Sequence, residues 1–160
     1  MSGKINARKK GHAFELWCIK AMSDLFPEAV SARSESKRLD DAGVDICYTG
    51  DIHFQCKAVE GSMDAFSVLD RMPRDKYRVL LWKKNRMGTL AVVPLSDMKK
   101  IVGDSGRDIN YAIETKKAMN LHKQGLVGGS GVLWAKEGKQ EPICALHFDE
   151  FMLILKERNR

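Results

Sequence analysis

The sequence has no long apolar run and no close pair of cysteines. None of its apolar segments approaches the ~20 residues that a membrane-spanning helix needs. The 160 residues are 44% apolar and 30% charged, which is the composition of an ordinary globular domain that folds without disulfides or a structural metal. We therefore expect a single domain over residues 1–160, and not a disordered chain, a long repeat array or a membrane protein.

Four cysteines are scattered through apolar segments. They are Cys18, Cys47, Cys56 and Cys144, with no Cys-x-x-Cys motif and no histidine at ligand spacing. This pattern indicates neither a zinc site nor a disulfide framework, and it favours buried thiols in a reducing compartment. Because residues 1–4 lead into polar residues and not into a signal-peptide core, we expect a cytoplasmic protein.

A modest basic excess favours a polyanionic partner. Lysine and arginine number 27 against 21 acidic residues, giving a net charge of +6. Two basic clusters are present, comprising Lys4, Arg8, Lys9 and Lys10 in the first and Arg33, Lys37 and Arg38 in the second. They are candidates for contacts with nucleic-acid phosphates. The alternative is a solvated basic face that keeps the protein soluble.

An amphipathic helix is predicted over residues 13–26, ending at Pro27. Its apolar positions are Ala13, Phe14, Trp17, Cys18, Ala21, Met22 and Leu25. Gly11 marks its possible start, and the preceding basic residues would form a mobile arm or a first turn. Glu15 lies near the edge of the apolar stripe, from where its carboxylate can reach a neighbouring sheet.

A β-hairpin is predicted over residues 44–59. Strands 44–48 and 52–59 are joined by a three-residue loop in which Gly50 can adopt a positive φ. Counting from the loop places Asp45 opposite Gln55, with both side chains on the same face. Strand alternation adds His53 and Lys57 to that face, so the hairpin gathers a carboxylate, an amide and an ammonium group.

The other segments alternate between strand and helix patterns. We expect strands at 29–32, 77–82, 89–93, 132–135 and 143–146, helices at 63–72, 96–102, 109–121 and 148–155, and a polar loop over 33–43. The order predicts an α/β fold. Trp82 and Trp134 are interpreted as core aromatics.

Glu15, the segment Gly43-Val44-Asp45-Ile46 and the segment Phe54-Gln55-Cys56-Lys57 together form an ordered pattern. It resembles the signature of PD-(D/E)xK nucleases, in a Gln-x-Lys variant. The run from Lys10 to Glu15 also resembles the opening helix of archaeal and phage Holliday-junction resolvases. The resemblance implies a restriction-endonuclease-like fold with a central mixed β-sheet flanked by helices, a core of about residues 8–102, and no assignment for residues 103–160.

This resemblance implies a divalent-metal site. Phosphodiester hydrolysis needs a hydroxide nucleophile and compensation for charge on the phosphate, and a bound ion supplies both. Mg²⁺, for which Mn²⁺ can substitute, prefers oxygen ligands. These would be the carboxylates of Glu15 and Asp45, the amide oxygen of Gln55 and the backbone carbonyl of Cys56. Lys57 would orient the attacking water or stabilise the developing negative charge, and Gln55 in place of glutamate should weaken metal attraction.

The function implied is a magnesium-dependent endodeoxyribonuclease that cuts four-way DNA junctions as a homodimer, in a bacterial, archaeal or phage-infected cell. Ser34 and Ser36 are candidates for phosphate contacts, as a similarly placed serine is in archaeal resolvases. His12 and His53 flank the site, and Asp40 and Asp41 are alternative acids if the register is shifted. The alternatives are a nuclease of this fold with another DNA substrate, a DNA-binding module without cleavage, and a small interaction protein with a fortuitous charge cluster.

Overall fold

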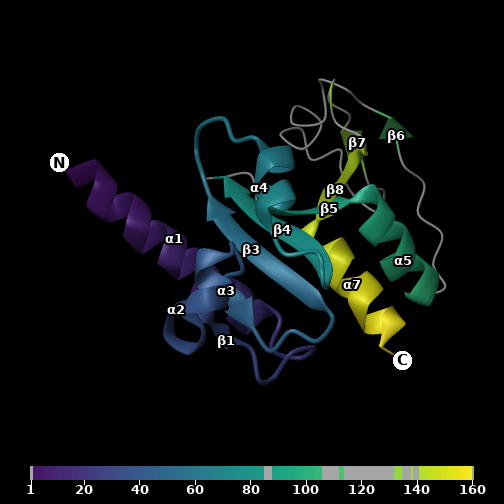
Figure 1. The fold of residues 1–160 in the computed structure, drawn as a ribbon, viewed down its shortest axis with the longest axis horizontal. Coiled ribbons are helices and arrows are strands. Elements are labelled where there is room, and N and C mark those ends of the chain that lie inside the picture. The colour runs from purple at the N-terminus through teal and green to yellow at the C-terminus, as the bar shows by residue number, and fades with distance from the viewer. Residues whose placement is uncertain are drawn as a thin grey trace. The chain divides into compact units, whose positions relative to one another are not determined.

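The structure is a computed structural model that describes residues 2–84, 88–105, 112–113, 132–134, 138 and 141–159, with side chains except at 2–5, 84, 104–105, 112–113 and 132–134. The chain divides into two compact units, Met1–Lys84 and Asn85–Arg160. Both combine helices with mixed β-strands (Figure 1). All the predicted catalytic and metal-binding residues lie in the first unit.

The first unit contains four helices and four strands among its described residues. They are α1 (Ser2–Ala21), β1 (Val30–Ser31), α2 (Ala32–Glu35), α3 (Lys37–Asp41), β2 (Ile46–Cys47), β3 (Ile52–Ala58), α4 (Ala65–Arg71) and β4 (Tyr77–Lys84). The strands lie in the order β1-β2-β3-β4. Pairing is antiparallel from β1 to β3, and β3 pairs in parallel with β4, with α4 in the crossover between them.

Helices α1 and α4 cover opposite faces of β3. The thiol of Cys56 on β3 hydrogen-bonds with that of Cys18 on α1, so even-numbered residues of β3 face α1. Gln55 and Lys57 instead share a pocket with Val68 of α4. Because successive strand residues point to opposite faces, β3 is covered on both sides.

Helix α1 is longer than predicted and buries a narrower stripe. It begins at Ser2, where we expected a start near Gly11, and it ends at Ala21. Phe14, Cys18 and Met22 are buried, whereas Trp17 is 46% exposed. The predicted apolar face therefore divides into two rows. Phe14, Cys18 and Met22 form the buried row, and Ala13, Trp17 and Ala21 form an exposed row beside it.

The predicted polar loop over residues 33–43 is mostly helical. Ser31 Oγ accepts a hydrogen bond from Arg33 N (3.3 Å) at the start of α2, and Ser36 Oγ accepts one from Leu39 N (3.3 Å) at the start of α3. Serine side chains commonly begin helices in this way, because they satisfy amide groups that have no helical partner. The loop prediction was wrong because it overlooked these two caps.

The second unit contains β5 (Gly88–Pro94), α5 (Leu95–Ser105), β6 (Ala112–Ile113), β7 (Val132–Trp134), β8 (Ile143–His147) and α7 (Phe148–Arg158), with strand order β5-β8-β7-β6. Strand β6 contradicts the helix predicted over 109–121 at residues 112–113, and the rest of that segment lies outside the described residues. The other five elements predicted in this unit are present, and Ser96 contacts Glu141 from within α5.

The α/β class and the mixed strands flanked by helices agree with the sequence prediction. Among the described residues, no helix combines the length and apolar character that crossing a membrane requires. All four cysteines are free and buried, as expected. Trp82 is buried as predicted, and the Trp134 side chain lies outside the described part.

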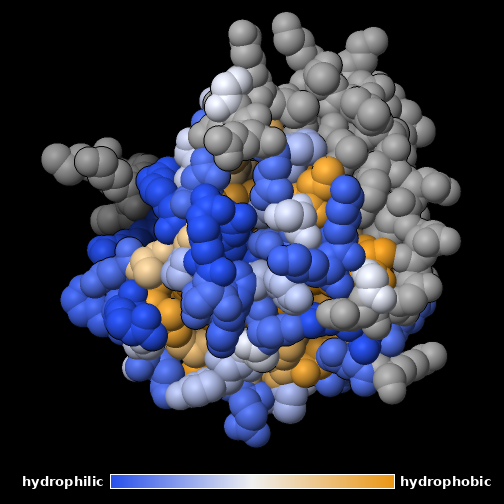
Figure 2. Space-filling view, turned by 45° about the vertical axis from the view of Figure 1, so that its right-hand side comes forward, coloured by the Kyte–Doolittle hydropathy of each residue, from blue (hydrophilic) through white to orange (hydrophobic). Residues whose placement is uncertain are grey.

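Hydrophilic residues cover most of the described surface in the view of Figure 2, with smaller hydrophobic areas between them.

Candidate functional site

The centre of the candidate site is Asp45, which immediately precedes β2. Ile46 pairs with Phe54, as the predicted hairpin register requires, and the backbone N–H of Asp45 donates to the carbonyl of Phe54 over 2.8 Å. Beyond this pair, the backbone N–H of Cys56 donates to Asp45 Oδ2 over 2.7 Å. A side-chain carboxylate thus takes the place of a strand partner, and it holds the start of β2 to the middle of β3.

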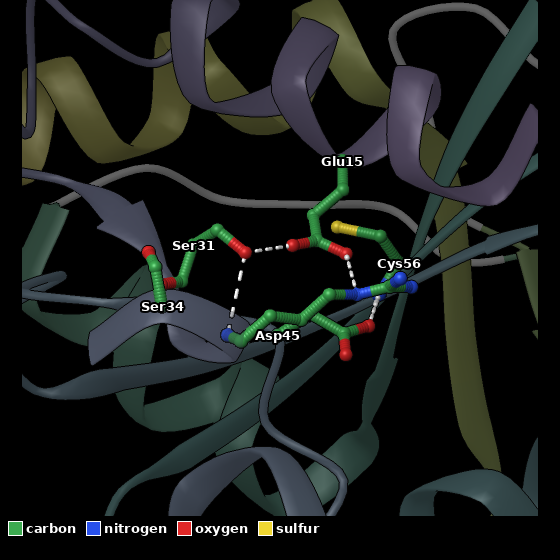
Figure 3. Close-up of polar contacts among 6 residues, drawn as sticks. Glu15, Ser31, Ser34, Asp45 and Cys56 are labelled. Carbon is green, nitrogen blue, oxygen red and sulfur yellow. Dashed lines mark hydrogen bonds and ion pairs between the residues drawn. The ribbon is translucent and has the colours of Figure 1, made fainter. Parts of the chain in front are cut away.

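Glu15 brings a second carboxylate to this region from α1. Its side chain is 2% exposed, and Ser31 Oγ donates a short hydrogen bond to Oε1. Arg33 Nε lies 3.4 Å from Oε2. Figure 3 shows Glu15 and Asp45 approaching the same place from different elements. A buried charge is tolerated when it is paired and hydrogen-bonded, and these two partners satisfy that requirement.

The electrostatic environment makes Asp45 unusually hard to ionise. Burial raises its pKa to about 6, and the charge of Glu15 adds to that rise. The hydrogen bond from Cys56 and the charge of Lys57 act in the opposite direction. A carboxyl group that titrates close to neutrality beside a second carboxylate and a lysine is typical of functional sites.

Gln55 and Lys57 face an open pocket of about 480 Å³. The other lining residues are Asp40, Asp41, Ala42, Gly43, Val68 and Arg71. Gly43 has a φ of +85°, and a Cβ there would lie 3.4 Å from Gln55 Oε1. Glycine at this position therefore accommodates the left-handed backbone, whereas a Cβ would make only an ordinary van der Waals contact with the amide group of Gln55.

The four predicted catalytic residues converge, but they do not all share one face of the sheet. Gln55 and Lys57 lie on the α4 side, whereas Glu15 comes from α1 on the opposite side. Asp45 lies between them, because the charges of both Glu15 and Lys57 act on its pKa. A ligand held by all four groups would therefore have to contact residues from both sides of β3.

The first predicted basic cluster lies on α1. Arg8 and Lys9 are exposed, and Lys10 Nζ forms a 2.5 Å ion pair with Glu60 Oε1. The side chain of Lys4 lies outside the described residues. Two exposed cations of this cluster are thus placed where a polyanion can reach them.

Two of the three basic side chains of the second cluster form ion pairs within the protein. Arg33 contacts Glu15, and Lys37 Nζ pairs with Asp41 Oδ2 at 2.7 Å, while Arg38 is exposed. Ser34 Oγ donates to the backbone carbonyl of Ser31 over 3.1 Å, and Ser36 caps α3. Both serines have local structural partners, so phosphate contact is not needed to explain their positions.

The two flanking histidines differ in their surroundings. His53 is buried on β3, and its Nε2 lies 2.9 Å from Asp75 Oδ1. His12 lies one turn before Glu15 on α1, and its buried Nδ1 has no hydrogen-bond partner among the described residues. His53 therefore has a structural partner, Asp75, which lies shortly before β4. His12 has a ring nitrogen without a hydrogen-bond partner in the described part of the chain, one helical turn before Glu15.

Sequence reasoning missed two residues of this site. Ser31 is the direct hydrogen-bond partner of Glu15, and Arg71 places a cation on the pocket that Gln55 and Lys57 line. Ser31 had a local signal, because a serine directly before a helix-forming run is a typical cap. Arg71 had none, because only the packing of α4 against the sheet brings it to the pocket.

The side chains around Asp45 offer oxygen donors, the atom type that a hard cation prefers. No group of three or more His, Cys, Asp or Glu side chains in the described ranges is arranged to hold a metal. Two carboxylates and the amide oxygen of Gln55 remain, and Mg²⁺ accepts such a set because it retains several waters. Burial raises the pKa of Asp45 most, the charge of Glu15 raises it further, and a bound cation would offset both effects.

Comparisons with protein-family models, curated proteins and solved structures found no match to this chain. No family assignment therefore supports or opposes a nuclease. The functional argument depends on the residues around Asp45 and on their geometry.

Proposed function

We propose that this protein is a magnesium-dependent endodeoxyribonuclease with a restriction-endonuclease-like fold, acting on branched DNA as a Holliday-junction resolvase. The observation that supports the proposal most is the position of Asp45. Its half-buried carboxylate accepts from the backbone N–H of Cys56 and is subject to the charges of both Glu15 and Lys57. An ordinary solvated hairpin face would not place a half-buried carboxylate beside a buried one.

In this proposal the two carboxylates and Gln55 hold the cation, with the backbone carbonyl of Cys56 as a further oxygen. Bound Mg²⁺ lowers the pKa of a coordinated water and offsets charge on the phosphate. Ser31 and Arg33 keep the Glu15 carboxylate in place, and the N–H of Cys56 fixes Asp45. Preorganised ligands of this kind lose little energy in reorganisation during the reaction.

Lys57 and Arg71 supply the positive charge of the pocket. Lys57 orients the attacking water or donates to a phosphate oxygen as negative charge develops, and Arg71 holds a neighbouring phosphate. Fixed cationic donors of this type are each worth about 10²–10³ in rate when they act on the transition state. The exposed Arg8, Lys9 and Arg38 add sequence-independent contacts to the DNA backbone, so affinity should fall steeply with salt.

A junction-cleavage assay tests this proposal. A labelled four-way junction is incubated with wild type, Asp45→Ala and Lys57→Ala, with Mg²⁺ or with EDTA. We expect cleavage only with metal and a loss of at least about 10²-fold in both variants. Asp24→Ala and Lys76→Ala are matched controls, because both residues are exposed and lie in the same unit. If both active-site variants cut as well as wild type, the assignment is wrong.

The substrate and the assembly are separate parts of the proposal. A panel of four-way junction, flap and linear duplex distinguishes a resolvase from a nuclease with another DNA substrate. Two symmetric incisions require two sites, so we propose a homodimer. Sedimentation with and without junction DNA tests that assembly, and a monomer bound to the junction would contradict it.

A second candidate is a DNA-binding module that does not cleave. Two observations favour it: Gln55 contributes no charge to the site, and Glu15 is already paired with Arg33. Both weaken the attraction for a cation. Tight junction binding with no nicking in either Mg²⁺ or Mn²⁺ would establish this alternative.

A further inference from the structure

Both oxygens of the Glu15 carboxylate already have a partner within the protein. Ser31 Oγ donates a hydrogen bond to Oε1, and Arg33 Nε lies 3.4 Å from Oε2. Figure 3 shows the Ser31 contact on the side of Glu15 that faces β1 and α2. The Glu15 side chain is only 2% exposed. A cation that binds Glu15 must therefore share or replace one of these two partners.

The two partners of Glu15 differ in how they meet a cation. The hydroxyl of Ser31 is neutral and the residue is buried, so it can keep its hydrogen bond to Oε1 while Oε2 changes partner. The guanidinium of Arg33 carries a positive charge, which repels any cation that approaches the same carboxylate. Arg33 is therefore the side chain that competes with a metal ion for Glu15.

The contact between Arg33 and Glu15 has the features of an exchangeable ion pair. Its separation of 3.4 Å exceeds the ~2.8 Å of a well-formed hydrogen bond between arginine and a carboxylate. The Arg33 side chain is 43% exposed, so solvent and other anions can reach it. Ion pairs with a solvent-accessible partner contribute little to stability. Arg33 can leave at small cost if a cation replaces it and keeps the buried charge of Glu15 paired.

A DNA phosphate is an anion that suits Arg33 well. The planar guanidinium of arginine matches the geometry of phosphate oxygens. Helix α2, which carries Arg33, packs against α3, which carries the exposed Arg38. A DNA strand that contacts Arg38 therefore passes near Arg33 as well.

We propose that Arg33 blocks the metal site in the free protein by pairing with Glu15, and that a DNA phosphate draws Arg33 away so that Glu15 can bind the cation. Arg33 is thus a positioning residue that acts through Glu15. DNA and Mg²⁺ favour each other's binding, and each raises the affinity for the other by the same factor. This inference rests on the proposed nuclease function, because it concerns the regulation of that cation site.

Calorimetric titration of the DNA-free protein with Mg²⁺ tests the competition. We expect Arg33→Gln to bind Mg²⁺ about 2- to 5-fold more tightly than wild type, the factor that corresponds to an ion pair of modest strength. Arg33→Lys keeps the positive charge and should stay close to wild type. Arg38→Gln is the matched control, because it removes an exposed arginine of the same basic cluster. If Arg33 only held Glu15 in place, Arg33→Gln would bind Mg²⁺ more weakly.

The transfer of Arg33 to a phosphate has its own measurement. Fluorescence anisotropy of a labelled blunt duplex in EDTA gives the slope of log affinity against log salt. Arg33→Gln should make this slope shallower by about 0.9, the value for one phosphate of duplex DNA. Lys99→Gln, which removes an exposed lysine of the second unit, should leave it unchanged. An unchanged slope in Arg33→Gln would overturn the proposal, because no phosphate would then draw Arg33 from Glu15.

Glu15→Gln tests the same exchange from the other side and does not leave a buried charge unpaired. It keeps an oxygen that accepts from Ser31, but it removes the charge that holds Arg33. This variant should bind the duplex in EDTA about 2- to 5-fold more tightly than wild type. Adding Arg33→Gln to it should abolish the gain. A gain that persists in the double variant would show that Arg33 does not mediate it.

The outcomes separate this inference from the nuclease proposal. Equal Mg²⁺ affinity in wild type and Arg33→Gln, or an equal gain in Arg38→Gln, would refute the role of Arg33. The nuclease itself is judged by junction cleavage of the wild-type protein in Mg²⁺. Cleavage together with unchanged Mg²⁺ affinity in Arg33→Gln would keep the nuclease and refute the exchange. Absence of both Mg²⁺ binding and cleavage in all these proteins would refute both.

Discussion

Replacing Asp45 by asparagine should make the metal-free protein more stable at neutral pH. The folded protein raises the pKa of Asp45 from 3.8 to about 6, chiefly through burial. Each pKa unit corresponds to 1.36 kcal/mol, so a shift of about two units disfavours the ionised folded form by up to about 3 kcal/mol. Asparagine keeps an oxygen that accepts from the N–H of Cys56, and it removes the charge.

The pH dependence follows from the same shift. Between pH 3.8 and about 6 the folded state binds more protons at Asp45 than the unfolded state does. The stability of wild type should therefore fall as pH rises through this window, relative to Asp45→Asn. The difference between the two proteins should be small below pH 3.8 and reach its full size above pH 6.

Urea unfolding followed by circular dichroism, in EDTA and at several pH values, measures this difference. Asp24→Asn is the control, because Asp24 is an exposed carboxylate in the turn after α1. Mg²⁺ should stabilise wild type and have a smaller effect on Asp45→Asn. If Asp45→Asn is less stable than wild type at pH 8 in EDTA, the argument from burial is wrong.

Two substitutions and one labelling experiment test the surroundings of the site. Gly43→Ala should lower the free energy of unfolding by about 1–3 kcal/mol in urea titrations, because its φ is +85°. Ser31→Ala should cost about 1–3 kcal/mol in the same assay, because it removes a hydrogen bond from the buried Glu15 carboxylate. Cys56 should react with iodoacetamide far more slowly in the native protein than in urea, because a hydrogen bond to another buried thiol, together with burial, raises its pKa.

The hairpin could be predicted from sequence because its signals are local. Alternation of polar and apolar residues sets the faces of β3, and the loop glycine sets the register. Gly50 has a φ of +62°, and the pairing of Ile46 with Phe54 is the one that the predicted loop requires. Tyr48 also adopts a positive φ of 64°, which no local pattern indicated.

The partners of Glu15 could not be predicted in the same way. Ser31 lies 16 residues away in the chain, and the contact exists because α1 packs beside β1. The periodicity of α1 likewise showed which residues are apolar, but not which row the sheet would cover. The sheet buries Phe14 and leaves Trp17 exposed, and only the tertiary packing makes that choice.

The two carboxylates present the strongest argument that this region is more than a structural hairpin. A structural role would be served as well by a neutral residue at position 45, since one oxygen suffices for the N–H of Cys56. Ionised Asp45 instead opposes folding above pH 6, and Glu15 adds to that opposition. Functional sites commonly retain groups that reduce stability, because ligand binding uses the charge that folding disfavours. If Mg²⁺ raises the free energy of unfolding by as much as ionised Asp45 lowers it, cation binding explains why the protein keeps two carboxylates that repel each other in this region.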